Sequence, residues 1–329
     1  MSLEHNINNY NDQKKHKILV VDDSAVIRKM VAHHLEHHNY EIITAEDGSK
    51  AITTLQQEKV DFVITDINMP EVGGFALIKK LSELGLDIPY VMITDADINK
   101  YIQLAIDHNV GNILSKPIEQ TELLSTVYKL LYPETLFGLK NYLGLEDGQL
   151  NTIEVKSSGE CEEAVKNIVE KAQGSGLNAE FITSLRLILS EMAINALYHP
   201  HGLTDKKLER ESVQLSDGDK IQLQFAHNKE KFGVSITDFA GKLTRITILE
   251  SFKKLIESNE LMMKAIEEGK DPMEYMQETG RGLQMAREMA NEYYFNIKAN
   301  EITEIVILTW LDKKPVDHAS HSIKINELS

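Results

Sequence analysis

Residues 61–66 read DFVITD, a short apolar run that ends in a carboxylate. Four more runs of this kind lie along the same part of the chain: ILVV at 18–21, YEIITA at 40–45, YVMIT at 90–94 and NILS at 112–115. Helical patterns separate or follow them, among them SAVIRKMVAHHLEHH, GSKAITTLQQE and GFALIKKLSEL. Alternating strand and helix signals of this kind predict an α/β fold with a doubly wound parallel sheet that is covered on both faces.

Polar residues stand at the carboxyl ends of these predicted strands, where α/β sheets of this class bind their ligands. Clustered carboxylates repel one another unless a cation neutralises them, and an all-oxygen site suits Mg²⁺. A lysine and a threonine hydroxyl opposite them suit the oxygens of a phosphoryl group. The pattern therefore predicts transfer of a phosphoryl group to a carboxylate. The residues concerned are Asp22, Asp23, Asp66, Thr94 and Lys116.

Three of these segments, KILVVDDS, DFVITDINMPEVGG and ILSKP, resemble the signature segments of the response regulator receiver domain over residues 17–132. The resemblance implies a flavodoxin-like (βα)5 fold and an upstream histidine kinase that phosphorylates Asp66. It also implies a cis peptide bond between Lys116 and Pro117. The implied site residues are Asp22, Asp23 and Asp66 with the backbone carbonyl of Asn68 for Mg²⁺, and Thr94 and Lys116 for the phosphoryl oxygens.

Two positions depart from the family pattern. Asp95 follows Thr94 where the family has a small residue, and an extra carboxylate there is expected to slow phosphorylation or to hasten its loss. Ile113 stands on the fifth strand where many receivers carry a switch Tyr or Phe. The resemblance therefore predicts phosphorylation but not signalling through an aromatic switch.

Composition narrows the classes of function. The formal net charge of −16 over 329 residues argues against binding to nucleic acid or to an anionic membrane. Cys161 is the only cysteine, so an internal disulfide is impossible and a cytoplasmic location is expected. The N-terminal segment is polar and lacks the apolar core of a secretory signal.

The pattern of elements divides the chain into parts. Residues 1–16 are expected to be a disordered tail, 17–132 the receiver, 133–151 a packed connector, 152–313 a second domain and 314–329 a C-terminal tail. In the second domain, helical patterns are grouped apart from four strands, the first two of which alternate with period two, and this grouping predicts a two-layer α/β sandwich. The connector either transmits a switch or only joins the two parts.

Three further motifs lie in the second domain. In LSEMAINALYHP, Glu191 and Asn195 are four residues apart, so both share one face of a helix, where an amide oxygen can ligate Mg²⁺ and a carboxylate can act as a base. In DFAG, a carboxylate at a strand end can accept a hydrogen bond from an exocyclic amine such as that of adenine. In TGRGLQMAREMANE, glycines precede a helix whose N-terminus favours phosphate. These residues are Asp238 and Gly241 in the second motif, and Gly280 and Gly282 in the third.

The set resembles the GHKL ATPase fold, and EMAINALYHP and GRGLQMAREMANE are most similar to the branch of anti-sigma-factor serine kinases. The resemblance implies that ATP binds with Mg²⁺ on Asn195, that Glu191 is the catalytic base and that Asp238 contacts adenine. It also implies Thr303 as an adenine-side residue, although Ile302 stands where a glycine is usual. The long segment 242–279 is expected to be a nucleotide lid or a partner-binding insertion.

Two functions remain open for the second domain. The first is an ATP-dependent protein serine/threonine kinase that acts on an anti-sigma-factor antagonist in a partner-switching pathway. The second is a regulator that binds nucleotide and captures a partner without catalysis. A histidine kinase is disfavoured, because no histidine lies between His108 and His199 to serve as its phosphorylation site. The oligomeric state is not fixed by the sequence, and a homodimer is among the possibilities.

Overall fold

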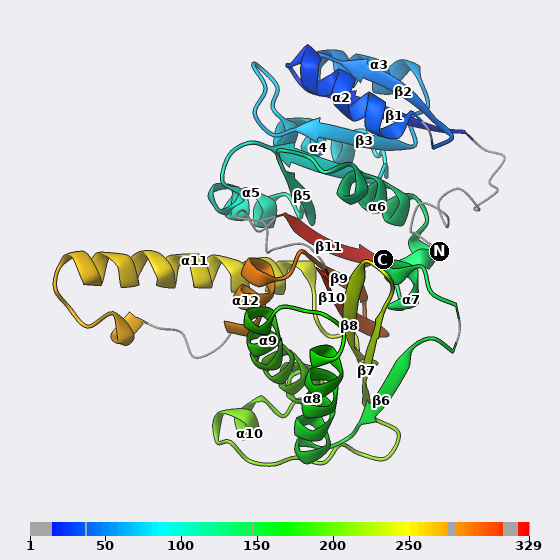
Figure 1. Ribbon diagram of the computed structural model, residues 1–329. Helices are drawn as coiled ribbons and strands as arrows, with labels where there is room; N and C mark the ends of the chain where they lie inside the picture. The colour runs from blue at the N-terminus through cyan, green and yellow to red at the C-terminus, as the bar shows by residue number, and fades with distance from the viewer. Residues whose placement is uncertain (1–14, 37, 147, 276–280, 312–321, 329) are drawn as a thin grey trace. The chain divides into compact units, whose positions relative to one another are not determined.

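The computed structural model describes residues 15–36, 38–146, 148–275, 281–311 and 322–328 (Figure 1). The chain divides into two compact units. Unit 1 comprises Met1–Leu136 with Ser322–Lys324, and unit 2 comprises Phe137–His321 with Ile325–Ser329. Most of the predicted N-terminal tail lies outside the described residues.

Unit 1 is built on a sheet with the strand order β2-β1-β3-β4-β5-β11. Strands β1 to β5 are all parallel, so the doubly wound sheet predicted from the apolar runs is confirmed. The strands are β1 (His16–Val21), β2 (Tyr40–Ala45), β3 (Phe62–Asp66), β4 (Tyr90–Thr94), β5 (Asn112–Ser115) and the first residues of β11 (Ile323–Leu328). The helices are α2 (Ala25–Leu35), α3 (Gly48–Gln57), α4 (Gly74–Glu83), η1 (Ile98–Tyr101), α5 (Ile102–Asp107), α6 (Gln120–Leu131) and η2 (Pro133–Thr135).

The apolar runs are continuous because both faces of this sheet are covered. All five residues of β3 are buried. One core combines Ile18 and Val20 of β1 with Val31 and Leu35 of α2, and with side chains of α6. Successive side chains of a strand point to opposite faces, so the residues between these, such as Leu19, are buried on the other side. Because both faces of such a parallel strand are buried, polar and apolar residues do not alternate along it. The sequence therefore does not show which of its side chains point to which face of the sheet.

Unit 2 has a mixed sheet with the strand order β11-β9-β10-β8-β7-β6. All its neighbouring strands are antiparallel except β9 and β11, which run parallel. The strands are β6 (Asn151–Val155), β7 (Ile221–His227), β8 (Lys231–Asp238), β9 (Glu292–Lys298), β10 (Ile302–Trp310) and the last residues of β11. The helices are α7 (Lys140–Leu143), α8 (Ser158–Gln173), α9 (Ala179–Tyr198), α10 (Thr204–Leu208), α11 (Arg245–Glu267), η3 (Pro272–Tyr275) and α12 (Arg281–Met289).

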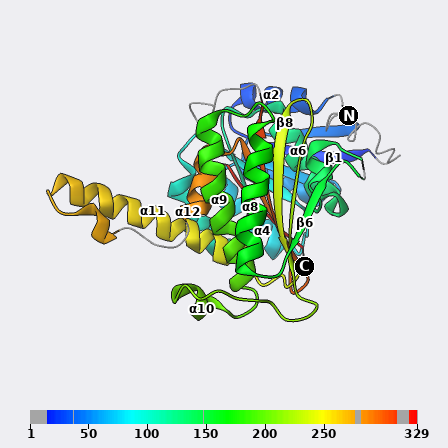
Figure 2. The same ribbon diagram turned by 60° about the horizontal axis from the view of Figure 1, so that its bottom comes forward.

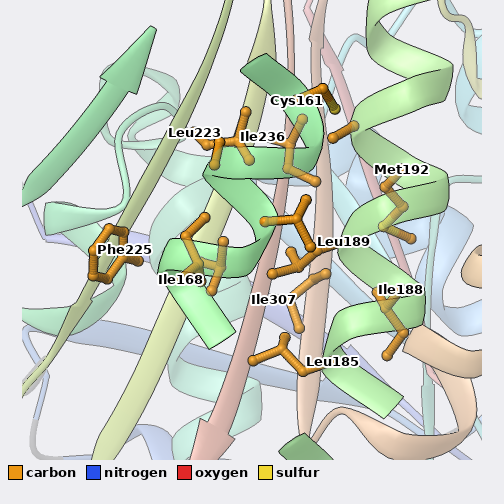
Figure 3. Close-up of a cluster of buried hydrophobic side chains, with 14 of the residues drawn as sticks. Cys161, Ile168, Leu185, Ile188, Leu189, Met192, Leu223, Phe225, Ile236 and Ile307 are labelled. Carbon is orange, nitrogen blue, oxygen red and sulfur yellow. The ribbon is translucent and has the colours of Figure 1, made fainter. Parts of the chain in front are cut away.

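A helical layer packs on one face of this sheet. Helices α8 and α9 lie side by side (Figure 2), and their apolar residues form a core with β7, β8 and β10 (Figure 3). Leu189 and Ile188 of α9 and Ile236 of β8 are fully or almost fully buried in it. On the opposite face, Leu139 and Leu143 pack beside Tyr294 in a smaller cluster, so part of the predicted connector belongs to the core of unit 2.

The C-terminal residues correct one expectation. A tail is expected from the sequence at 314–329, but residues 323–328 form β11. Ile323 pairs with Ile113 of β5 in unit 1, and Ile325 pairs with Phe295 of β9 in unit 2. Both isoleucines are completely buried. Strand β6, at the other edge of the sheet of unit 2, is also absent from the expected elements.

Helix α9 is long and apolar enough to cross a membrane by length and composition alone. Half of its most apolar window is nevertheless buried inside the protein. It also carries Glu191 and Asn195, and it packs against α8 and α12. These features are those of a core helix.

Candidate functional site

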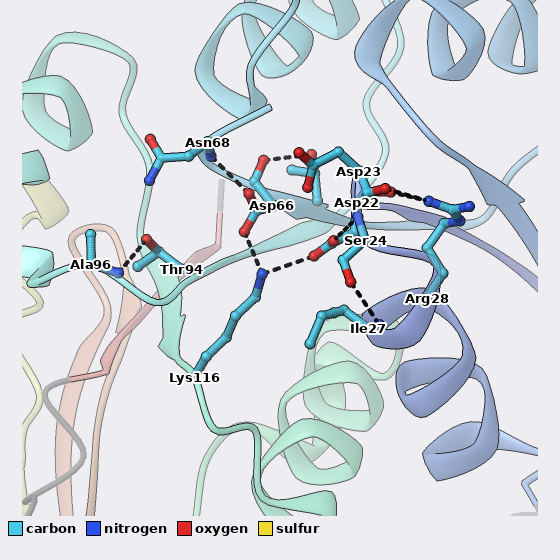
Figure 4. A network of polar contacts seen from close by, with 11 residues as sticks. Asp22, Asp23, Ser24, Ile27, Arg28, Asp66, Asn68, Thr94, Ala96 and Lys116 are labelled. Atoms are coloured by element: carbon cyan, nitrogen blue, oxygen red, sulfur yellow. Dashed lines mark hydrogen bonds and ion pairs between the residues drawn. The ribbon is translucent and has the colours of Figure 1, made fainter. Parts of the chain in front are cut away.

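The first candidate site lies at the carboxyl ends of β1, β3, β4 and β5 in unit 1. Val21 at the end of β1 pairs with Thr65, so Asp22 follows β1 next to Asp66 at the end of β3. Lys116 follows β5 and donates to both carboxylates, with 2.9 Å from Nζ to Asp22 Oδ2 and 2.8 Å to Asp66 Oδ1 (Figure 4). The structure therefore brings together three of the predicted site residues through one ammonium group.

Burial makes this cluster electrostatically unusual. Asp22 is fully buried and Asp66 is 3% exposed. Burial raises the pKa of Asp66, while the hydrogen bond and the charge of Lys116 act against the rise. Burial acts to lower the pKa of Lys116, but its hydrogen bonds to Asp66 and Asp22 outweigh this and raise the pKa. The lysine thus stays protonated beside two carboxylates that one positive charge cannot fully neutralise.

Local capping holds the loop between β1 and α2 in place. Ser24 is the N-cap of α2, its hydroxyl accepts from Ile27 N, and its own backbone N–H donates to Asp22 Oδ1 at 2.8 Å. Arg28 donates to the backbone carbonyls of Asp22 and Asp23 (Figure 4). Asp23 itself is exposed at the surface of the site. Arg28 is not among the site residues predicted from the sequence, because its role in orienting this loop has no sequence signal beyond its place one turn into the helix.

The remaining predicted residues line the same edge. The backbone N–H of Asn68 donates to Asp66 Oδ2 at 2.9 Å, which fixes the loop after β3 against the carboxylate. Thr94 is fully buried, and its hydroxyl accepts from Ala96 N at 3.1 Å. The expected cis bond between Lys116 and Pro117 is present.

A second residue of this site, besides Arg28, was not expected from the sequence. The hydroxyl of Tyr101, in η1, accepts from the side-chain amide of Asn68 at 2.6 Å. Its ring lies 6.2 Å, centroid to centroid, from that of Phe75. Tyr101 follows Thr94 by seven residues, a spacing that corresponds to no common motif, so only the fold reveals the contact.

The residues of this first site fit a divalent cation such as Mg²⁺. Among the described residues, no three His, Cys, Asp or Glu side chains are grouped closely enough to hold a metal ion by themselves. A Mg²⁺ ion prefers few carboxylates and retains several waters, so the predicted set of aspartate side chains with the Asn68 carbonyl meets its needs. The excess negative charge of buried Asp22 and Asp66 over Lys116 favours such a cation.

The second candidate site lies in unit 2, on α9 and the start of α12. The Glu191 carboxylate accepts from the backbone N–H of Gly282. A side chain at Gly282 would approach Glu191 Cβ to 2.9 Å and the Ile188 carbonyl to 3.3 Å, so only glycine fits this close approach. An N–H of the first turn of α12, expected to bind phosphate, is thus satisfied by Glu191. The amide oxygen of Asn195, expected to bind Mg²⁺, accepts from the ammonium of Lys207 in α10.

The residues expected near adenine lie together at the end of β8. Thr303 of β10 is the partner of Asp238 in the antiparallel pair of strands. Asp238 Oδ1 accepts from the backbone N–H groups of Ala240 and Gly241, and burial raises the pKa of its carboxyl group. Gly241 has a φ of 57°, and a Cβ there would lie 2.5 Å from the backbone nitrogen of Glu301.

The outcome for this second set is mixed. The Thr303 hydroxyl is buried, and it hydrogen-bonds to the Asp238 carboxyl group, whose pKa this contact acts to lower. Gly280 lies outside the described residues. The roles of Asn195, Asp238, Gly241, Gly282 and Thr303 in nucleotide binding, and of Glu191 in catalysis, stay predictions.

Comparison with known proteins identifies unit 1. Residues 18–128 match the family model of the response regulator receiver domain. The chain is 34% identical over 110 residues to the sensor histidine kinase RcsC of Salmonella typhi, which is 33% of this chain and 12% of that protein. It is 31% identical over 115 residues to the alkaline phosphatase synthesis transcriptional regulatory protein PhoP of Bacillus subtilis, 35% of this chain and 48% of that protein. Among solved structures, the chemotaxis protein CheY4 of Vibrio cholerae is 33% identical, with 36% of this chain and 99% of that chain covered at a TM-score of 0.34.

Proposed function

Because residues 18–128 are a response regulator receiver domain, we propose that Asp66 accepts a phosphoryl group from an upstream histidine kinase. The observation that carries this proposal is the ammonium of Lys116, which lies within 3 Å of Asp66 and of Asp22. A carboxylate oxygen of Asp66 attacks the phosphorus atom, a new P–O bond forms, and the P–N bond to the kinase histidine breaks. The histidine nitrogen leaves with the electron pair of the broken bond.

The surrounding residues have separate tasks in this transfer. In this proposal the ammonium of Lys116 moves from Asp66 to an oxygen of the incoming phosphoryl group and neutralises its charge. The hydroxyl of Thr94, buried at the end of β4, donates to another phosphoryl oxygen. Asp22, Asp23 and Asp66 with the Asn68 carbonyl would hold Mg²⁺, which neutralises phosphoryl charge when it is bound.

The test uses the full chain and labelled acetyl phosphate. Wild type is expected to acquire label in the presence of Mg²⁺, and Asp66→Asn is expected to acquire none. Lys116→Ala should retain the fold and label at a much lower rate, because the attacking carboxylate loses its counter-charge. Equal labelling of Asp66→Asn and wild type would show that the phosphorylated residue is elsewhere.

We further propose that unit 2 is an ATP-binding output domain of the GHKL type, controlled by the receiver. The buried carboxyl group of Asp238 and the buried hydroxyl of Thr303, on paired strands, support an adenine pocket. In this proposal Glu191 deprotonates a serine or threonine hydroxyl of an anti-sigma-factor antagonist, and Asn195 lies beside the phosphates of ATP. The proposed setting is a cytoplasmic partner-switching pathway.

One observation favours the second candidate, a regulator that binds nucleotide and a partner protein without catalysis. Glu191 is already hydrogen-bonded to Gly282 N, and Asn195 to Lys207. A base that is engaged in this way has to be released before it can accept a proton. Incubation with labelled ATP and candidate antagonist proteins separates the two functions. Transfer that is lost in Glu191→Ala supports the kinase, whereas ATP binding without transfer supports the regulator.

A further inference from the structure

Lys207 lies beside the proposed nucleotide site, and no motif in the sequence pointed to it. It is on α10, twelve residues after Asn195, and its ammonium donates to the Asn195 amide oxygen. The side chain is half-buried. Burial lowers the pKa of Lys207, and the Glu191 carboxylate nearby acts against this shift. The lysine is therefore a partly desolvated cation that points at the face shared by Glu191 and Asn195.

The charge of Lys207 is poorly compensated where it lies. An ammonium group has three N–H donors, and the Asn195 amide that accepts one of them is neutral. Among the described residues, the carboxylate that acts on the charge of Lys207 is that of Glu191, and its effect on the pKa is smaller than that of burial. The Glu191 carboxylate is itself hydrogen-bonded to the backbone of Gly282. A partly buried cation with a neutral partner is suited to bind an anion.

Lys207 and Mg²⁺ compete for the same atom. The amide oxygen of Asn195 is the ligand expected for Mg²⁺, and it is the acceptor for Lys207. Two cations on one oxygen repel each other strongly in a partly desolvated site. If the ammonium stays, the cation that neutralises a bound phosphate is the lysine.

We propose that Lys207 is a phosphate-binding residue that takes the place of Mg²⁺ on Asn195. Unit 2 then binds the polyphosphate of a nucleoside triphosphate without needing a divalent cation. The inference rests on the proposed nucleotide site of unit 2. In this inference a side chain of α10, Lys207, neutralises the charge of the bound phosphates. Nucleotide can then bind whether or not Mg²⁺ is bound.

The test is calorimetric titration of the full chain with ATP, once with Mg²⁺ and once with EDTA. Wild type is expected to bind ATP with dissociation constants that agree within about threefold in the two buffers. Lys207→Ala is expected to weaken binding in EDTA by about tenfold to a hundredfold, the usual range for one charged hydrogen bond. Mg²⁺ should restore much of that loss, because it can then reach Asn195. Lys207→Arg, which keeps the charge, should bind better than Lys207→Ala in EDTA.

Lys206→Ala is the matched control, because Lys206 is the exposed neighbour on the same helix and should leave both affinities unchanged. The role of Lys207 is overturned if wild type binds ATP only with Mg²⁺ and Lys207→Ala binds ATP with the same or higher affinity. That result would still support the nucleotide site. No heat from wild type in either buffer overturns the nucleotide site and the inference together. If Lys207→Ala does not fold, the ratio of the two wild-type affinities decides alone.

Discussion

Replacing Lys324 with methionine is predicted to destabilise unit 1. The ammonium of Lys324 lies 2.7 Å from Glu122 Oε1, and the two side chains are 3% and 9% exposed. Removing one partner of a buried ion pair typically costs about 3–5 kcal/mol, because the other charge stays desolvated. Methionine keeps the length and apolar stem of the lysine, so the loss is mostly electrostatic. We expect about 3 kcal/mol, the lower end, since both residues make further interactions.

A double-mutant cycle isolates the pair from the packing. Glu122→Gln removes the negative charge, so the variant with both substitutions should recover at least half of the stability that Lys324→Met loses. The two amides that follow Asn112 in β5 are suitable reporters, because they lie in the strand that pairs with Lys324. Hydrogen exchange there should be about a hundredfold faster in Lys324→Met, which corresponds to about 3 kcal/mol.

Trp310 is the only tryptophan and lies in β10, so its fluorescence follows unit 2 separately. The urea midpoint from that signal serves as the comparison for unit 2. A change below about 1 kcal/mol in Lys324→Met, or no recovery in the double variant, would refute the claim that this ion pair is an energetically important part of unit 1.

Three further predictions concern single residues. Asp66→Asn should stabilise the chain increasingly as the pH rises above 3.8, the ordinary pKa of an aspartate. Because the pKa of Asp66 is raised in the folded state, the folded wild type holds this proton to a higher pH than the unfolded state does, and it loses stability over that range. Thermal melts of both proteins at several pH values measure the difference. Cys161, whose pKa burial raises to about 12, should resist alkylation at pH 8 in the native protein and react at once in denaturant. Rapid labelling of the native protein would contradict its burial in the core of unit 2. Tyr101→Phe should shorten the lifetime of the Asp66 phosphoryl group about two- to tenfold, the value of one hydrogen bond to Asn68, in a dephosphorylation time course. An unchanged lifetime would mean that the Tyr101 contact does not restrain the site.

The receiver site was predictable because its residues stand at the ends of recognisable strands. A parallel sheet brings strand ends together by geometry, so Asp22, Asp66 and Lys116 meet although 94 positions separate the first from the last. The same reasoning gave the doubly wound sheet, whose core alternates between both faces of the strands. Local periodicity was sufficient to predict a helix or strand wherever that element is long or uniformly apolar.

The missed features depend on non-local pairing. Strand β11 reads IKINEL, a short run with three charged or amide side chains, and it becomes a strand only because the edges of β5 and β9 accept it. Its Asn326 donates to Asn296, and Asn296 donates to Tyr142 in α7. No periodic pattern in the sequence predicts this buried network of hydrogen bonds. Lys207 and Tyr101 likewise reach their sites from short helices whose position only the tertiary fold determines.

The late position of β11 in the chain has a consequence during translation. Ser115 at the end of β5 precedes Ser322, its partner in the structure, by 207 residues. At an elongation rate of about 5–20 residues per second, β5 leaves the ribosome roughly 10–40 s before the segment that pairs with it. For that time the nascent receiver has an exposed sheet edge, of the kind that recruits chaperones or pairs with a neighbouring chain on the same messenger RNA.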